Sequence, residues 1–240
     1  MQISIHALLG GAHHAKGLTV VIDVFRAFST ACYTLKAGAA CIIPVAELEQ
    51  AYALKREHPD WLLMGERGGI KQPGFDFGNS PTEVEAADLS GRTVVHTTSA
   101  GTQGLAAAMS APEVSEVLTG SFVNLGATIA YIRRRAPEAV TFVAMGTAGR
   151  ERSGEDDLCA MYMKNELQGV PNRFEAIKGY LATIESARKF FDPKAEYAPE
   201  RDFELCTALD RFDFALVAGR GEDGLLTLRA AIPAPSEHET

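Results

Sequence analysis

The chain has 240 residues, of which 46% are hydrophobic and 22% are charged, and these values exclude a disordered, collagen-like or coiled-coil protein. With 23 basic and 31 acidic residues the formal net charge is −8, which argues against nucleic acid or a membrane surface as a partner held by long-range electrostatics. We therefore expect a soluble globular protein, and an anionic substrate is not excluded, because a few local arginines can still form a basic pocket.

Short apolar runs alternate with helical patterns along the chain. The predicted strands are residues 19–24, 41–45, 61–64, 93–96, 116–119, 141–145 and 214–218. The predicted helices are residues 29–37, 47–57, 102–109, 123–135, 156–168, 174–190 and 199–210. Several of the strands are continuous apolar runs, which is typical of strands buried on both faces. The alternation predicts an α/β fold with a mainly parallel sheet.

A weak internal repeat bears on the domain organisation. Thr19-Val20-Val21 and Thr93-Val94-Val95 each begin a predicted strand–helix unit. We expect residues 1–240 to form a single catalytic unit. If the repeat is a true duplication, that unit consists of two similar lobes, about 15–90 and 91–235, with the active site between them. The alternative is a coincidence between strand–helix units, which all look alike.

The cysteines and the N-terminal segment favour the cytoplasm. The four cysteines show no CxxC spacing, so neither a zinc site nor a redox motif is expected. The first residues lack the basic segment and apolar run of a secretory signal, and no stretch approaches the roughly 18 apolar residues of a membrane span. We therefore expect reduced thiols in a cytoplasmic protein.

Ligands of open α/β sheets bind beyond the carboxyl ends of the strands, so the residues that follow each predicted strand are the candidates. Asp23 follows the first strand and suits a hard cation such as Mg²⁺. Arg26 offers a planar fork of donors for phosphate or sulfonate. Ser29 and Thr30 begin the next helix, whose N-terminal amides favour an anion. The alternative is a structural Asp–Arg ion pair beside a helix cap.

The Gly-Glu-Arg-Gly-Gly segment after the third predicted strand offers a second set of ligands. Glu66 is another metal candidate, while Arg67 and Lys71 supply positive charge. Gly68 and Gly69 free the backbone amides to approach an anion. The alternative is a surface turn with solvated charges.

Three further loops carry polar residues. In the loop 73–81, Asp76 and Asn79 are candidates, whereas Ser80 is expected to cap a helix that begins at Pro81. The turn after the fourth strand is rich in hydroxyls and is typical of a phosphate cradle, with Thr97, Thr98, Gly101 and Thr102 as its candidates. Ser121 follows the next strand, and its hydroxyl either caps a helix or donates a hydrogen bond to an anion.

Glu155 and Asp156 are second-tier metal candidates. They belong to an acidic cluster before an apolar helix face, and the positive end of that helix dipole explains part of the cluster. It does not explain the neighbouring Arg150 and Arg152. Together with the earlier loops, these residues indicate metal-assisted phosphoryl chemistry. The rivals are a non-catalytic protein that binds an anionic metabolite and a metal-dependent phosphotransferase.

The same residues form motifs that resemble those of the 2-phosphosulfolactate phosphatase (ComB) family. In chain order they are Asp23-Val24-x-Arg26-Ala27 with Ser29-Thr30, Gly65-Glu66-Arg67-Gly68-Gly69, Pro73-Gly74-Phe75-Asp76, Gly78-Asn79-Ser80-Pro81, Thr97-Thr98 with Gly101-Thr102, Gly120-Ser121-Phe122-x-Asn124, and Glu155-Asp156 with Cys159-Ala160. The resemblance implies three α/β/α layers with a duplicated character. It also implies a Mg²⁺-dependent phosphatase that converts 2-phospho-3-sulfolactate to 3-sulfolactate in coenzyme M synthesis. Because Ala100 precedes Gly101 where the family has Asn, another small anionic phospho-acid is the alternative substrate.

These interpretations give a complete hypothesis for the site. Mg²⁺ is the expected cofactor, held by Asp23, Glu66 and Asp156. The catalytic candidates are Asp23, Glu66, Asp76, Glu155 and Asp156. The substrate-binding candidates are Arg26, Ser29, Thr30, Arg67, Gly68, Gly69, Lys71, Asn79, Thr97, Thr98, Gly101, Thr102 and Ser121. We expect a homodimer, because most soluble enzymes of this size associate in closed symmetry.

Overall fold

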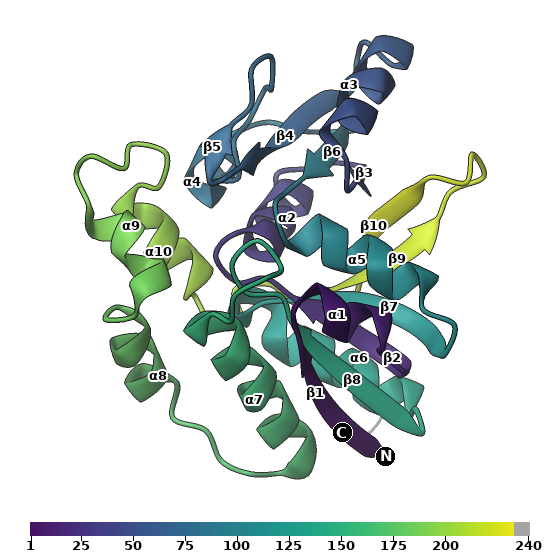
Figure 1. The fold of residues 1–240 in the computed structure, drawn as a ribbon, viewed down its shortest axis with the longest axis vertical. Coiled ribbons are helices and arrows are strands. Elements are labelled where there is room, and N and C mark those ends of the chain that lie inside the picture. The colour runs from purple at the N-terminus through teal and green to yellow at the C-terminus, as the bar shows by residue number, and fades with distance from the viewer. Residues whose placement is uncertain (233–240) are drawn as a thin grey trace, which may run out of the picture.

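Ten strands form one mixed sheet in residues 1–232, the part of the chain that the computed structural model describes (Figure 1). The order across the sheet is β1-β8-β2-β7-β9-β10-β3-β6-β4-β5. The strands are β1 (Gln2–Ala7), β2 (Gly17–Ile22), β3 (Cys41–Pro44), β4 (Leu62–Arg67), β5 (Ile70–Lys71), β6 (Thr93–Thr97), β7 (Val114–Gly120), β8 (Ala139–Ala144), β9 (Ala215–Arg220) and β10 (Leu226–Ala231).

The sheet consists of two parallel blocks joined by an antiparallel hairpin. β1, β8, β2 and β7 pair in parallel and form the four-strand block. β3, β6 and β4 also pair in parallel and form the three-strand block. Between them lies the β9–β10 hairpin, which is antiparallel to β7 on one side and to β3 on the other. Each block takes strands from both of the ranges 15–90 and 91–235, so the predicted lobes are interleaved in the sheet.

Helices cover both faces of the sheet. They are α1 (Leu8–His13), α2 (Ala27–Lys36), α3 (Leu48–Glu57), α4 (Pro81–Glu85), α5 (Gly101–Ser110), α6 (Leu125–Arg135), α7 (Gly154–Gln168), α8 (Phe174–Leu181), α9 (Arg188–Phe191) and α10 (Glu200–Cys206), with 3-10 turns η1 (Phe122–Asn124) and η2 (Glu185–Ala187). α1, α2 and α5 pack on one face, while α6 and α7 pack on the other face of the four-strand block. The expected three-layer α/β/α fold with a mainly parallel sheet is confirmed.

The central strand β2 shows how the sequence sets these layers. Its side chains alternate with a period of two, so Val21 packs with α1, α2 and α5. Val20 and Ile22 point the other way and pack with α6 and α7. All three are fully buried, which explains why the strand reads as a continuous apolar run.

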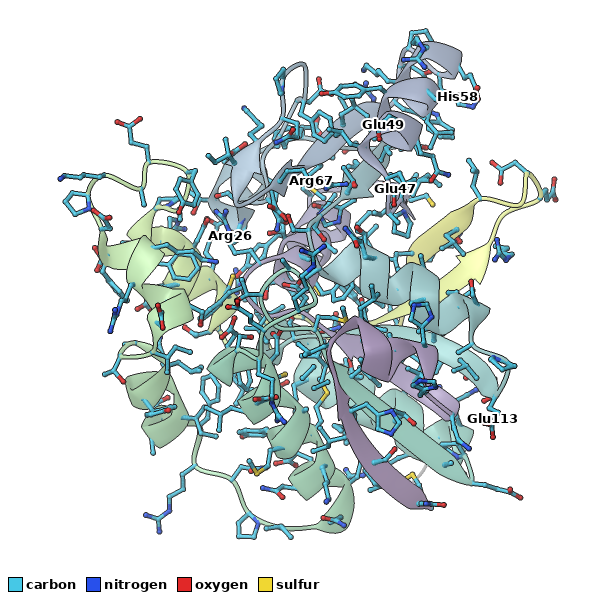
Figure 2. The ribbon with its side chains drawn as sticks, in the orientation of Figure 1. Arg26, Glu47, Glu49, His58, Arg67 and Glu113 are labelled. Carbon is cyan, nitrogen blue, oxygen red and sulfur yellow. The ribbon has the colours of Figure 1, made fainter. Side chains whose placement is uncertain are left out.

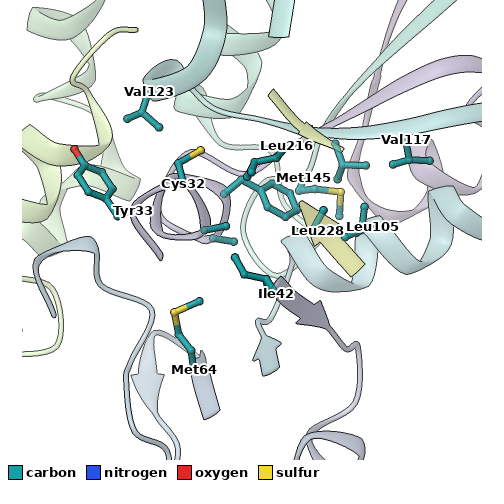
Figure 3. Packing of buried hydrophobic residues seen from close by; sticks show 14 of the residues in the cluster. Cys32, Tyr33, Ile42, Met64, Leu105, Val117, Val123, Met145, Leu216 and Leu228 are labelled. Atoms are coloured by element: carbon teal, nitrogen blue, oxygen red, sulfur yellow. The ribbon is translucent and has the colours of Figure 1, made fainter. Parts of the chain in front are cut away.

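Helix α2 lies between the two blocks (Figure 1). Its residues 27–34 are all buried. Figure 3 shows Cys32 of this helix in one cluster with Ile42 and Met64 of the three-strand block, and with Val117 of the four-strand block. One hydrophobic core therefore connects both blocks through α2.

The predicted elements are mostly confirmed. Each of the seven predicted strands overlaps an observed one, whereas β1, β5 and β10 were not predicted. The continuous helix expected over 174–190 is wrong. α8 ends at Leu181, and the chain is extended at Ile184 before η2 and α9. This break is what brings Ser186 and Lys189 to the cavity described below. Within residues 1–232, no helix combines the length and apolar character needed to cross a membrane.

Candidate active site

A cavity of about 560 Å³ lies where the loops from the two parallel blocks meet. The four-strand block supplies the loop after β2, with Asp23, and the loop after β8, which leads into α7. The three-strand block supplies the end of β4, with Glu66, and the turn after β6. The segment from η2 to Tyr197 completes the wall. The cavity thus lies at the carboxyl ends of the parallel strands, the usual ligand position in α/β folds.

Asp156 fastens the two loops of the four-strand block to each other. Its Oδ1 accepts a hydrogen bond from the Val24 amide and its Oδ2 accepts one from the Gly146 amide, both at 2.8 Å. Asp23 is held within its own loop, because its Oδ1 accepts from the Ala27 amide at 3.2 Å. Both carboxylates are buried. The acidic start of α7 therefore positions the loop that carries Asp23.

Glu66 performs the same task in the three-strand block. Its Oε2 accepts from the Gly69 amide at 2.6 Å and from the Ser99 hydroxyl at 3.0 Å. Its Oε1 accepts from the Ser99 amide at 2.7 Å. The paired glycines after Glu66 allow this tight return, since Gly68 and Gly69 have φ values of 61° and 84°. The Gly-Glu-Arg-Gly-Gly segment folds around its own carboxylate.

Burial and mutual repulsion change the protonation of the carboxylates. Burial, reinforced by the charges of Glu66 and Glu155, raises the pKa of Asp23 to about 7. Burial and the neighbouring Glu155 and Asp23 raise the pKa of Asp156 well above its usual range. Burial also raises the pKa of Glu155, whose Oε2 accepts a 2.5 Å hydrogen bond from the Ser186 hydroxyl. A cavity with this much buried acid favours a cation, because a cation relieves the repulsion.

Arg26 lines the cavity, but most of its donors are already used. Its Nη1 donates to Oδ2 of Asp202 and to the Tyr197 carbonyl, both at 2.7 Å, and its Nη2 donates to the Gly69 carbonyl at 3.3 Å. The Arg26 and Asp202 side chains are 2% and 0% exposed. The ion pair foreseen for Arg26 is present, with Asp202 rather than Asp23 as its partner.

Lys189 is a cavity residue that the sequence did not reveal. It lies in α9, its Nζ donates to the Phe25 carbonyl at 3.3 Å, and it sits 5.2 Å from the centre of the Phe190 ring. Burial and the nearby charge of Arg26 lower its pKa, although Glu155 and Asp23 act in the opposite direction. Ser99 and Ser186 line the cavity as well and were also missed, whereas Arg152, noted beside the acidic cluster in the sequence, lines it too. An isolated lysine in a predicted helix carries no signal of such a role.

The structure brings together eight of the predicted site residues on the cavity wall. They are Asp23, Arg26, Glu66, Gly68, Gly69, Asn79, Glu155 and Asp156. The predicted residues that do not line it are Ser29, Thr30, Arg67, Lys71, Asp76, Thr97, Thr98, Gly101, Thr102 and Ser121. The contacts of the second group explain their positions.

Arg67 lies in the three-strand block, at the end of β4 (Figure 2). It donates to the carbonyls of Glu66 and Ala46 and to the Thr97 hydroxyl, at 2.7–2.8 Å. Asp76 accepts a hydrogen bond from the Leu63 amide instead of reaching the cavity. Lys71 also turns away from the cavity, because its Nζ lies 3.9 Å from Oε2 of Glu83.

Several hydroxyl residues of this group bond to nearby backbone or cap a helical turn, whereas the buried Thr30 hydroxyl has no partner within residues 1–232. Ser29 donates to the Val24 carbonyl, and the Thr98 hydroxyl accepts from the Thr102 amide. Ser121 forms a capping box with Asn124 at the start of η1. Gly101 lies directly behind the site, because a Cβ there would stand 2.8 Å from Oδ2 of Asp23. Gly101 thus leaves room for the Asp23 carboxylate.

The carboxylate oxygens of the cavity fit Mg²⁺ as part of a ligand set that the substrate and water complete. Within residues 1–232, no three His, Cys, Asp or Glu side chains are placed to hold a metal by themselves. Mg²⁺ is commonly bound by one or two carboxylates, with water and phosphate oxygens as its other ligands. The buried oxygens of Asp23 and its acidic neighbours meet that need once an anionic substrate is present.

These features define an α/β enzyme with an acidic active-site cavity at the carboxyl ends of its strands. A family model described as 2-phosphosulpholactate phosphatase matches residues 5–218. The chain therefore belongs to the 2-phosphosulpholactate phosphatase family, a family of phosphoric monoester hydrolases.

Three relatives illustrate the similarity, and each is named "Probable 2-phosphosulfolactate phosphatase". The protein of Thermotoga petrophila is 36% identical over 202 residues, which cover 80% of this chain and 85% of the relative. That of Bacillus subtilis (strain 168) is 30% identical over 219 residues, covering 88% and 92%. That of Thermus thermophilus is 37% identical over 187 residues, covering 78% and 76%.

Proposed function

We propose that this protein hydrolyses the phosphate monoester of 2-phospho-3-sulfolactate to 3-sulfolactate and inorganic phosphate. Family membership over most of the chain supports the substrate, because its relatives carry that name. The observation that carries the chemistry is the cavity, which four buried carboxylates, a lysine and two arginines line. We place this reaction in coenzyme M synthesis, where it would supply 3-sulfolactate, the sulfonated hydroxy acid.

We further propose that the reaction requires Mg²⁺, which Asp23 and the phosphate oxygens would hold directly and Glu66 and Asp156 would hold through water. When bound, the ion screens the charge of the phosphate and of the buried carboxylates. Asp156 also keeps the loops after β2 and β8 at a fixed distance through its two amide contacts. This rigidity holds Asp23 in place against the charge of its neighbours.

Glu155 is the proposed general base. Asp76 lies outside the cavity, and both oxygens of Asp156 already accept backbone amides. Glu155 is held at Oε2 by Ser186, and burial raises its pKa, which makes it a better proton acceptor than an ordinary carboxylate. It takes the proton from the attacking water as the bond from phosphorus to the ester oxygen breaks. The departing hydroxy acid leaves with a proton from solvent.

The first test is phosphate release from 2-phospho-3-sulfolactate, with Mg²⁺ and with a chelator, beside 2-phospholactate and an aryl phosphate. We expect turnover that requires Mg²⁺ and favours the sulfonate. Glu155→Gln should lower kcat at least about 100-fold, a typical general-base effect, whereas the control Asp76→Asn should stay within about threefold. Release of phosphate only from the other two esters would contradict 2-phospho-3-sulfolactate as the substrate. Release from none of the three would contradict the proposed hydrolase activity.

We also propose that the protein is a cytoplasmic homodimer that acts on a small anionic ester without nucleic acid or membrane partners. The four cysteines, all in the described part of the chain, are buried and unpaired, as expected in a reducing compartment. The net charge of −8 disfavours polyanions. Light scattering coupled to size exclusion will give the mass in solution, and a monomer would contradict the dimer.

A further inference from the structure

Three cations line the cavity, and they differ in what they have left to offer a substrate. They are Arg26, Arg152 and Lys189. Arg26 is committed to Asp202 and to two backbone carbonyls. Arg152 is 63% exposed and forms a two-pronged ion pair with Asp157. Both guanidinium charges are thus already paired with a carboxylate.

Lys189 is the exception. Its single hydrogen bond goes to the Phe25 carbonyl at 3.3 Å, which leaves two of the three ammonium donors available. It takes part in none of the ion pairs found in residues 1–232, although Asp23 and Glu155 lie near enough to influence its charge. A partly buried ammonium with spare donors is a strong site for an anion, because it has less water to lose than an exposed one.

The position of Lys189 is fixed from both sides. Ser186, one helical turn before it, is held by Glu155. Tyr197, further along the same segment, is held by Arg26 through its carbonyl. The side chain also lies over the Phe190 ring, which itself packs edge-on against Phe25 at 5.0 Å. The ammonium is therefore preorganised, so binding an anion there requires little further ordering.

The proposed substrate carries a carboxylate and a sulfonate besides its phosphate, and neither group can stay unpaired in such a cavity. Its phosphate belongs with the proposed cation, which neutralises it. The sulfonate, which has no metal, would face the remaining negative charge and lose its hydration. It needs a direct positive partner, and Lys189 is the lining cation that forms no ion pair within residues 1–232. The carboxylate is present in 2-phospholactate as well, so only the sulfonate distinguishes the two esters.

We propose that Lys189 binds the sulfonate of the substrate and thereby determines specificity for a sulfonated phospho-acid. This inference rests on the proposed function. Lys189 acts as a substrate-binding residue, and it contacts the part of the substrate that does not react. Its loss should therefore affect a substrate with the sulfonate far more than one without it.

The experiment compares kcat/KM for 2-phospho-3-sulfolactate and for 2-phospholactate, which lacks only the sulfonate. In Lys189→Met the ratio of the two values should fall roughly 10- to 100-fold, the loss typical of one charged hydrogen bond. Lys189→Arg keeps the charge and should restore part of the ratio. Lys194→Met makes the same change at an exposed lysine of the same segment and should leave the ratio as in the wild type.

A binding measurement separates this inference from the proposed function. Calorimetry on the wild type should show tighter binding of 3-sulfolactate than of lactate, and Lys189→Met should lose that difference. If the ratio of kcat/KM values is unchanged in a variant with wild-type circular dichroism, even where both values fall, the role of Lys189 is overturned. If the wild type hydrolyses neither ester, the proposed function fails, and the calorimetric difference alone decides whether Lys189 binds a sulfonate.

Discussion

Asp23 interacts electrostatically with charged residues from both sides of the cavity. It follows the central strand β2, it is buried, and its charge is opposed by Glu66 and Glu155. An ordinary core would not keep so many acids together, since each unpaired charge costs stability. Active sites commonly accept that cost, and the raised pKa of Asp23 is therefore a sign of function as well as of burial.

Replacing Asp23 by Asn should stabilise the protein while removing its activity. The pKa of Asp23 is about 7 in the folded chain and 3.8 for an ordinary aspartate, so between these values the native state holds a proton that the unfolded chain has lost. Stability from this group therefore falls as the pH rises through that window. At pH 8 the variant should be more stable than the wild type by roughly 1–4 kcal/mol, and the gap should narrow toward pH 4.

Denaturant unfolding at pH 4, 6 and 8 with a chelator present measures this gap, and phosphate release measures the loss of turnover. Asp213→Asn changes an exposed aspartate outside the cavity and serves as the control. A gap that does not change with pH would show that Asp23 titrates normally. Wild-type turnover in the folded variant would remove Asp23 from the mechanism.

The acidic part of the site could be predicted from the sequence, because Asp23 and Glu66 come at the ends of buried strands. Topology alone brings such positions to one edge of a sheet. Lys189 and Ser186 could not be predicted, because they reach the cavity through a break in a helix. Beyond the break, Ser186 bonds to Glu155, more than 30 positions away along the chain. Local sequence patterns do not encode such contacts.

At the scale of elements, Asp202 joins α10 to α4 and to the loop after β2. Its Oδ2 accepts from Arg26, while its Oδ1 accepts from the hydroxyls of Ser80 and Thr82 and from the Thr82 amide. The carboxylate is fully buried. This single carboxylate accepts from two segments that are distant from α10 in the sequence.

Asp202→Ala should therefore be strongly destabilising. It leaves the Arg26 guanidinium buried without its counter-charge, and loss of one partner of a buried ion pair typically costs about 3–5 kcal/mol. Denaturant unfolding monitored by circular dichroism will measure the loss. Glu200→Ala removes an exposed carboxylate from the same helix and should change stability by less than about 0.5 kcal/mol. A cost for Asp202→Ala no larger than that of the control would show that water replaces the carboxylate.

The three strands that were not predicted share one property, which is that none of them contains a long continuous apolar run. The predicted strands were recognised as apolar runs, which mark strands covered on both faces. β1 lies at the edge of the sheet and alternates Ile3 and Ile5 with polar residues, so it lacks that signature. β10 alternates in the same way, with Leu228 buried and Arg229 exposed. β5 has only two residues.

At the scale of the whole molecule, both halves of the sheet are needed to form the cavity. Asp23 comes from the four-strand block and Glu66 from the three-strand block. Contact between the blocks runs through the β9–β10 hairpin and through the core around α2. Since that core is continuous, the two blocks should not unfold independently.

Leu228→Ala tests this coupling. Leu228 is fully buried, and in the sheet it stands opposite Ala218 of β9 and Ile42 of β3, so it packs where the hairpin meets the three-strand block. Its truncation should cost about 2–5 kcal/mol and lower Tm by roughly 5–15 °C. Unfolding should remain a single transition, with circular dichroism and phosphate release lost together, because neither block holds a complete site. Ile232→Ala, just beyond β10 and 74% exposed, should leave Tm unchanged. Two separated transitions, with activity lost in the first, would instead show that the blocks are independent folding units.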